Sequence, residues 1–107
     1  MKIIDGHMHT KGAPGRWFAD CADARGYEAY AVLSLSCMQA YGGDRNNEEC
    51  LAAKRADPAR AYFFAGLVHP CADTLQHIQR WLDRGAEGVK LIETKPTVWK
   101  ETGADLS

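Results

Sequence analysis

The 107-residue sequence contains no long uninterrupted hydrophobic run, and Asp5 interrupts the apolar start of the chain. We therefore expect neither the apolar core of a signal peptide nor a membrane-spanning segment. A large excess of one charge is also absent, because 13 Lys and Arg stand against 14 Asp and Glu, for a formal net charge of -1. This balance gives no electrostatic footprint for nucleic acid or an anionic membrane. The absences predict a cytoplasmic protein with neither partner.

The sequence also lacks a Cys-x-x-Cys motif, and its four cysteines, Cys21, Cys37, Cys50 and Cys71, lie far apart. This spacing fits neither a zinc knuckle nor a small disulfide framework. We expect reduced thiols, most of them buried as small apolar residues. Low-complexity segments and close internal repeats are absent too, and 46% apolar with 25% charged residues is ordinary for one globular domain.

Alternating apolar and amphipathic segments predict an α/β fold. Short apolar runs have the length of buried strands, and the segments between them show helical spacing. The predicted strands span about 2–8, 30–36, 61–68 and 88–93, and the predicted helices about 16–25, 46–56 and 74–84. This order is typical of a parallel sheet whose strands are connected by helices.

The predicted helix ends carry recognisable signals. Gly26 and Gly85 are placed to stop the first and third helices. Asp44, Asn46 or Asn47 is available to cap the second. In the third helix, one apolar stripe is expected to face the sheet, formed by Leu75, Ile78, Trp81 and Leu82.

The first strand ends in the densest cluster of metal-ligand chemistry in the sequence, with Asp5, His7 and His9 at alternate positions. Alternation along a strand would direct all three to one side. Two imidazoles at i and i+2 can then hold one zinc, iron, copper or nickel ion. A bare His-x-His pair is often only solvated polar surface. Its position at a strand end, before a loop rich in Gly and Pro, favours the metal site.

Three motifs in this order carry a family resemblance: Ile-Ile-Asp-Gly-His-Met-His at 3–9, Asp-Pro-Ala-Arg at 57–60 and Gly-Ala-Glu-Gly-Val-Lys-Leu at 85–91. Together they resemble the amidohydrolase-related (amidohydrolase 2) family of metal-dependent hydrolases. The resemblance implies a (β/α)₈ barrel in which the first-strand His-x-His holds the metal with a His of the fifth strand and an Asp of the eighth. Only His7 and His9 carry over to this sequence.

A complete barrel of this type needs about 250 residues. The resemblance therefore implies a single partial domain over residues 1–107, a parallel (βα)₃β half of a TIM barrel that lacks the fifth to eighth strands. Right-handed connections between strands in the order 1-2-3-4 put all three helices on one face. The other face and both edge strands would stay bare. We expect that the half is completed by self-association or is a truncated piece.

Four further residues are candidates for contacts around the metal or the substrate. Asp5 could orient the histidines by hydrogen bonds. His69 ends the third predicted strand, where a substrate contact competes with a plain hydrogen-bonded terminus. Lys90 lies where some binuclear relatives use a carbamylated lysine, and Glu93 could contact metal or substrate or form a cap or ion pair.

The resemblance implies hydrolysis of a small organic substrate by a metal-activated water, with zinc as the expected ion, although this chain alone would be incomplete. A competing hypothesis is a non-catalytic α/β fragment or self-associating module whose metal pair is vestigial. A response-regulator-like or other flavodoxin-like domain is a third alternative. It ranks last, because the Asp cluster that such a domain needs is not evident at the strand ends.

Overall fold

The computed structural model describes residues 2–10, 12–13, 15–36, 44–67 and 73–91. In these segments, four parallel strands form one sheet in the order β1-β2-β3-β4, and three helices connect them. The elements are β1 (Ile3–Met8), α1 (Gly15–Arg25), β2 (Tyr27–Leu33), α2 (Arg45–Ala56), β3 (Ala61–Gly66), α3 (Thr74–Arg84) and β4 (Gly88–Lys90). The predicted α/β class with parallel strands is confirmed.

The second strand lies three residues earlier than the predicted 30–36. Gly26 ends α1 with φ 70°, and the chain enters the sheet at once, with Tyr27 paired to Ile3. The strand ends at Leu33. The Ser34 N–H still donates to the Phe64 carbonyl at 3.1 Å, and side chains accept the backbone N–H groups that follow. The Leu35 N–H donates to Asn46 Oδ1 at 2.6 Å.

Two other strands end earlier than predicted. β3 ends at Gly66 instead of residue 68, and β4 ends at Lys90 instead of residue 93. Residues 68, 92 and 93 lie outside the described part of the chain. The apolar runs therefore locate both strands, but the carboxyl end of a strand is set by its neighbour's hydrogen bonds rather than by hydropathy.

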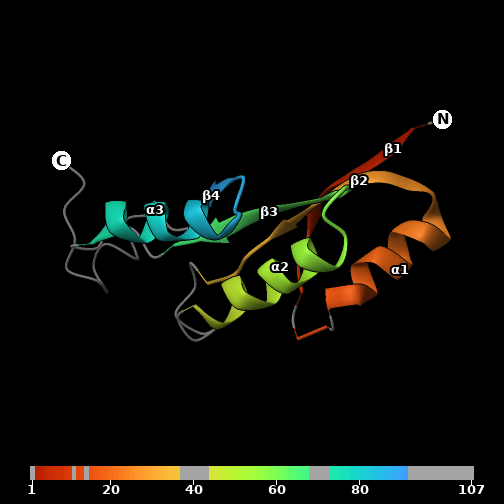
Figure 1. Ribbon diagram of the computed structural model, residues 1–107. Coiled ribbons are helices and arrows are strands. Elements are labelled where there is room, and N and C mark those ends of the chain that lie inside the picture. Colours follow the sequence, from red (N-terminus) through yellow and green to blue (C-terminus); the bar gives the residue numbers. More distant parts are fainter. Residues whose placement is uncertain (1, 11, 14, 37–43, 68–72, 92–107) are drawn as a thin grey trace, which may run out of the picture.

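All three helices bury residues against the same face of the sheet. Phe18 of α1 stacks on Tyr30 with ring centroids 6.3 Å apart, and Trp81 of α3 meets Phe63 edge-on at 6.0 Å. Residues of α2 complete this core: Cys50, Leu51 and Ala53. Figure 1 shows α1 and α2 side by side below the strands, with α3 at the far end of the sheet. This one-sided cover is what right-handed connections between adjacent parallel strands require.

The opposite face of the sheet carries apolar side chains that no described helix covers. Ile4 is 66% exposed and Tyr62 is 47% exposed. Neighbouring residues on this face form cross-strand pairs, such as Ala31 with Tyr62. We call this surface, formed by Ile4, Ala29, Ala31, Tyr62 and Phe64, the uncovered face.

The apolar stripe predicted for α3 is mostly not buried. Trp81 is fully buried, whereas Leu75 is 78% exposed and Leu82 is 39% exposed. The helix lies at the far end of the sheet (Figure 1) and reaches the core mainly through this one indole. Arg80 and Arg84 extend over the Trp81 ring. Helical spacing identified the helix correctly but could not show how little of the stripe the short sheet would cover.

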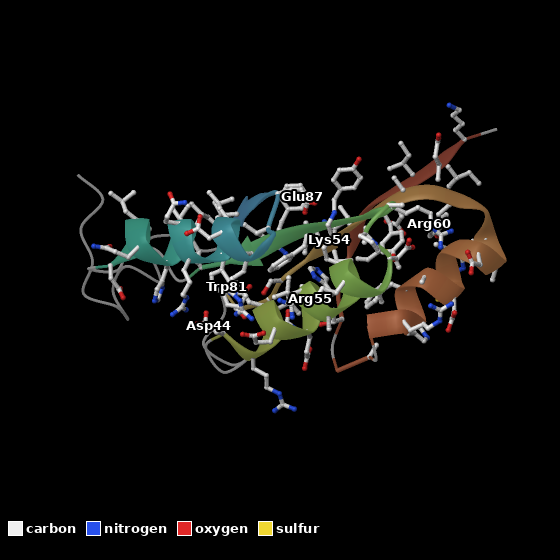
Figure 2. The ribbon with its side chains drawn as sticks, in the orientation of Figure 1. Asp44, Lys54, Arg55, Arg60, Trp81 and Glu87 are labelled. Atoms are coloured by element: carbon white, nitrogen blue, oxygen red, sulfur yellow. The ribbon has the colours of Figure 1, made fainter. Side chains whose placement is uncertain are left out.

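Ionic and polar groups join the amino ends of the strands to the helices. Lys54 forms an ion pair with Glu87 at 2.5 Å, and the other oxygen of Glu87 accepts the Phe63 N–H at 2.6 Å (Figure 2). The Tyr30 hydroxyl donates to Asp57 at 3.0 Å. Burial and this carboxylate raise the pKa of Tyr30, so the phenol stays neutral in the folded chain.

We expect Gly15→Ala to destabilise the fold by about 1–3 kcal/mol, as overpacking does elsewhere. A Cβ at Gly15 would lie 2.8 Å from the backbone carbonyl group of Ala52, where α1 crosses α2. Chemical denaturation followed by circular dichroism measures the change. Gly6→Ala is the matched control, because a Cβ there meets nothing within 4 Å. Equal stability of the two variants would contradict the close approach of the helices.

Candidate metal centre

The two histidines predicted as metal ligands meet at the carboxyl end of the edge strand β1. Their Nε2 atoms lie 2.9 Å apart, and the ring planes are nearly perpendicular, at 89°. The His7 side chain is exposed, whereas His9 is half-buried. Both rings therefore direct the same nitrogen to one point beside the sheet.

His9 is anchored from behind by the neighbouring strand. Its Nδ1 lies 2.7 Å from the carbonyl oxygen of Leu33, the last residue of β2. A carbonyl oxygen can only accept, so Nδ1 carries the proton and neutral His9 presents a lone pair at Nε2. In the metal-free chain, the Nε2–H of His7 donates to that lone pair. The His9 nitrogen that faces His7 is thus prepared to act as a ligand.

Asp5 acts on the backbone beside the histidine pair. Its Oδ1 accepts the backbone N–H of His7 at 3.0 Å, and the predicted orientation of the imidazole rings by Asp5 stays a prediction. The register of β1 against β2 slips between Asp5 and Met8, and simple alternation does not hold over this segment. Asp5 fixes the backbone on which His7 is mounted.

Of the remaining predicted site residues, the structure describes only Lys90, and this residue is not brought to the histidine pair. Lys90 ends β4, at the opposite edge of the sheet from β1. Its carbonyl accepts the Leu67 N–H at 3.2 Å. His69 and Glu93 lie outside the described residues, and their roles stay predictions.

A buried polar layer at the carboxyl ends of the strands was missed by the sequence analysis. Its members are Thr10, Ser34, Ser36, Asn46 and Asn47. Asp44, Asn46 and Asn47 were all predicted as possible caps of this helix. Asp44 takes the N-cap position, and both asparagines lie within α2. The sequence signals that could have revealed this layer are the two adjacent asparagines at the start of α2 and the Thr10 hydroxyl directly after His9.

Asn47 ties the first turn of α2 to the end of β3. Its Oδ1 accepts the Gly66 N–H at 2.8 Å, and its Nδ2 donates to the Gly66 carbonyl at 3.0 Å. A buried backbone group without a partner is costly. One side chain here satisfies both backbone groups of a strand end.

Glu49 binds the loop after β1 through hydrogen bonds to one of its carboxylate oxygens. Its Oε2 accepts from the Thr10 hydroxyl at 2.9 Å, from Asn46 Nδ2 at 2.8 Å and from the Gly12 N–H at 3.2 Å. Burial alone would raise the pKa of the Glu49 carboxyl, but these three hydrogen bonds outweigh it and lower the pKa. The carboxylate therefore stays charged at neutral pH.

Cys50 lies in the core next to this layer. Burial raises the pKa of its thiol to about 12, so it stays protonated at neutral pH. This agrees with the predicted role of a small buried residue, and a thiolate ligand at this position is not favoured.

The histidine pair fits half of a tetrahedral zinc site. Zinc–nitrogen bonds of about 2.0–2.1 Å separate two ligand nitrogens by about 3.3 Å, and the observed separation is 2.9 Å. A small torsional change of the exposed His7 ring would open the pair sufficiently. Within the described residues, however, no group of three or more His, Cys, Asp or Glu side chains is placed to hold a metal ion.

Comparisons with protein-family models, curated proteins and solved structures gave no significant match. Among the helices in the described part of the chain, none has the length and apolar character needed to cross a membrane.

NMR of the imidazole nitrogens tests the geometry of the pair without any metal. At neutral pH, we expect His9 to be the Nδ1–H tautomer, with a slowly exchanging proton, because Leu33 accepts that hydrogen bond. His77 on α3, which pairs with Asp73 at 3.3 Å, serves as the comparison ring. An Nε2–H tautomer at His9 would contradict the anchoring described above.

Proposed function

We propose that this chain provides the first part of a metal-dependent hydrolase site of the amidohydrolase type, in which His7 and His9 bind a divalent ion, zinc in the first instance. The observation that carries the proposal is the convergence of the two Nε2 atoms at 2.9 Å, with His9 held through Nδ1 by a backbone carbonyl. Metal-ligating histidines almost always donate their other ring N–H in this way. A merely solvated pair would have no need of such an anchor.

The architecture supports the same proposal at the level of the fold. Four adjacent parallel strands with helices on one face are compatible with half of a TIM barrel, and the uncovered face would be the interior of that barrel. Active sites of such barrels lie at the carboxyl ends of the strands, where the histidine pair is found. The other half would come from further chain or from a partner.

Each residue of the pair has a defined task in this proposal. His9 presents a fixed lone pair, while the exposed His7 ring turns and carries its proton on Nδ1 instead of Nε2, so that the Nε2 of His7 can also bind the ion. When bound, the ion supplies Lewis acidity that activates water toward a C–N, C–O or C–C bond of a small organic substrate. The described residues provide two ligands, so the remaining ligands come from outside them. His69 and Glu93 stay candidates for contacts with the metal or the substrate.

Zinc titration by calorimetry tests the proposal on the 107-residue chain. The double variant His7→Ala, His9→Ala is expected to lose at least about tenfold in Zn²⁺ affinity, since both imidazole ligands are removed. His77→Ala is the matched control and should bind like the unmodified chain. Elemental analysis of the purified chain should agree with the calorimetric stoichiometry. Equal zinc affinity in the double variant and the control would rule out the pair as ligands.

A second candidate function is self-association through the uncovered face, with the histidine pair vestigial. The exposure of Ile4 and Tyr62 on that face favours it, because monomeric proteins rarely leave large contiguous apolar patches in water. Among the described strands, β1 and β4 are the two edges of the sheet, and such edges add to the tendency to associate.

Light scattering separates this candidate from the first. If the uncovered face mediates association, the unmodified chain forms a dimer or larger species, and Tyr62→Lys shifts the mass to that of a monomer. Leu75→Lys on α3 is the control, because Leu75 is exposed at 78% but lies off the sheet. A monomeric unmodified chain would exclude self-association as its function.

A further inference from the structure

One side chain of α2 joins the two backbone segments that place His9. Asn46 Nδ2 donates to Thr10 Oγ1 at 2.6 Å, and Asn46 Oδ1 accepts the Leu35 N–H at 2.6 Å. Thr10 directly follows His9, and Leu35 lies two residues after Leu33, whose carbonyl holds the His9 ring. The same amide thus bonds both Thr10, the residue directly after His9, and the segment that follows the strand end orienting the His9 ring.

Burial makes this bridge specific. Asn46 and Thr10 are each only 3% exposed, and Leu35 is 6% exposed. Water is therefore poorly placed to replace the amide, and loss of either partner leaves a buried polar group unsatisfied. The two strand ends have few ways to keep their spacing without Asn46.

Glu49 completes the arrangement from the next turn of the same helix. It accepts hydrogen bonds from both Thr10 and Asn46, and from the N–H of Gly12 beyond them. The Thr10 hydroxyl can donate only one proton, and it gives it to Glu49, so its oxygen is free to accept from Asn46. The Thr10 hydroxyl proton and the amide protons of Asn46 therefore each have an acceptor within this cluster.

We propose that Thr10, Asn46 and Glu49, here named the Asn46 clamp, are positioning residues for the histidine pair. They hold His9 against Leu33 so that its Nε2 lone pair faces His7 before any ion arrives. In this proposal the clamp acts through His9 and is not itself a ligand of the ion. The proposal rests on the proposed function for its effect on metal binding, but its effect on the His9 ring is independent of it.

The matched pair of variants is Asn46→Ala and Asn47→Ala. The two side chains are buried in the same turn of α2, but Asn47 bonds Gly66 of β3 instead of the segments around His9. Both changes should lower stability. We expect only Asn46→Ala to weaken Zn²⁺ binding, by about tenfold, as loss of supporting hydrogen bonds does at other metal sites. Equal zinc affinities in the two variants would overturn the clamp.

The His9 ring gives a second readout that needs no metal. In Asn46→Ala, the Nδ1–H signal of His9 should exchange faster with water, whereas Asn47→Ala should leave it unchanged. If the unmodified chain binds no zinc, the proposed function fails, and this NMR comparison alone decides whether the clamp positions His9. An unchanged His9 signal in Asn46→Ala would then reject it.

Thr10→Val and Thr10→Ser provide a second test in case the Asn46→Ala variant does not fold. Valine keeps the shape of threonine but removes the hydroxyl shared by Asn46 and Glu49, while serine keeps the hydroxyl. If Asn46→Ala is unfolded, we expect Thr10→Val to show the loss of zinc affinity and the faster His9 exchange, and Thr10→Ser to restore both. Identical behaviour of the valine and serine variants would overturn the proposal.

Discussion

Two asparagine side chains in the first turn of α2 hold the carboxyl ends of the sheet together. Asn46 bonds Thr10, two residues after β1, and Leu35, two residues after β2, and Asn47 bonds the end of β3. Parallel strands that end side by side leave backbone groups without a ladder partner, and buried groups of this kind must be satisfied. The amides solve this within one helical turn. These hydrogen bonds fix where each strand ends relative to its neighbours, and thereby the position of His9.

The two ends of the sheet divide the work between them. At the amino ends, ion pairs and hydrogen bonds tie Lys54, Glu87 and Asp57 to the strands, and these groups are occupied in holding helices against the sheet. At the carboxyl ends, the polar groups bond the loop after β1 and the strand ends next to the histidine pair. A separation of this kind would let substitutions of the histidines change the proposed metal binding while the contacts at the opposite end stay in place.

Much of the fold was predictable from local patterns, and the candidate site only in part. The apolar runs and the glycines at 26 and 85 located the strands and helices, and the spacing of His7 and His9 predicted that the rings meet. The register slip after Asp5 could not be read from alternation, because it depends on pairing with β2. The burial of Asn46 and Asn47 also depends on neighbours that are distant in sequence, so capping was the natural local interpretation. For α3, periodicity could show which side is apolar but not how far the sheet extends beneath it.

The position of β1 at an open edge has a thermodynamic consequence for any ion that the histidines bind. Among the described strands, β2 alone pairs with β1, and edge strands open locally at lower free energy than central ones. An ion bound by both His7 of β1 and His9, whose ring bonds Leu33, would link the edge strand to β2. Part of the binding free energy would then appear as protection of β1 against fraying, and loosening of the edge would in turn weaken the ion's hold. Occupancy of the site and order of the edge strand are therefore two readings of one equilibrium.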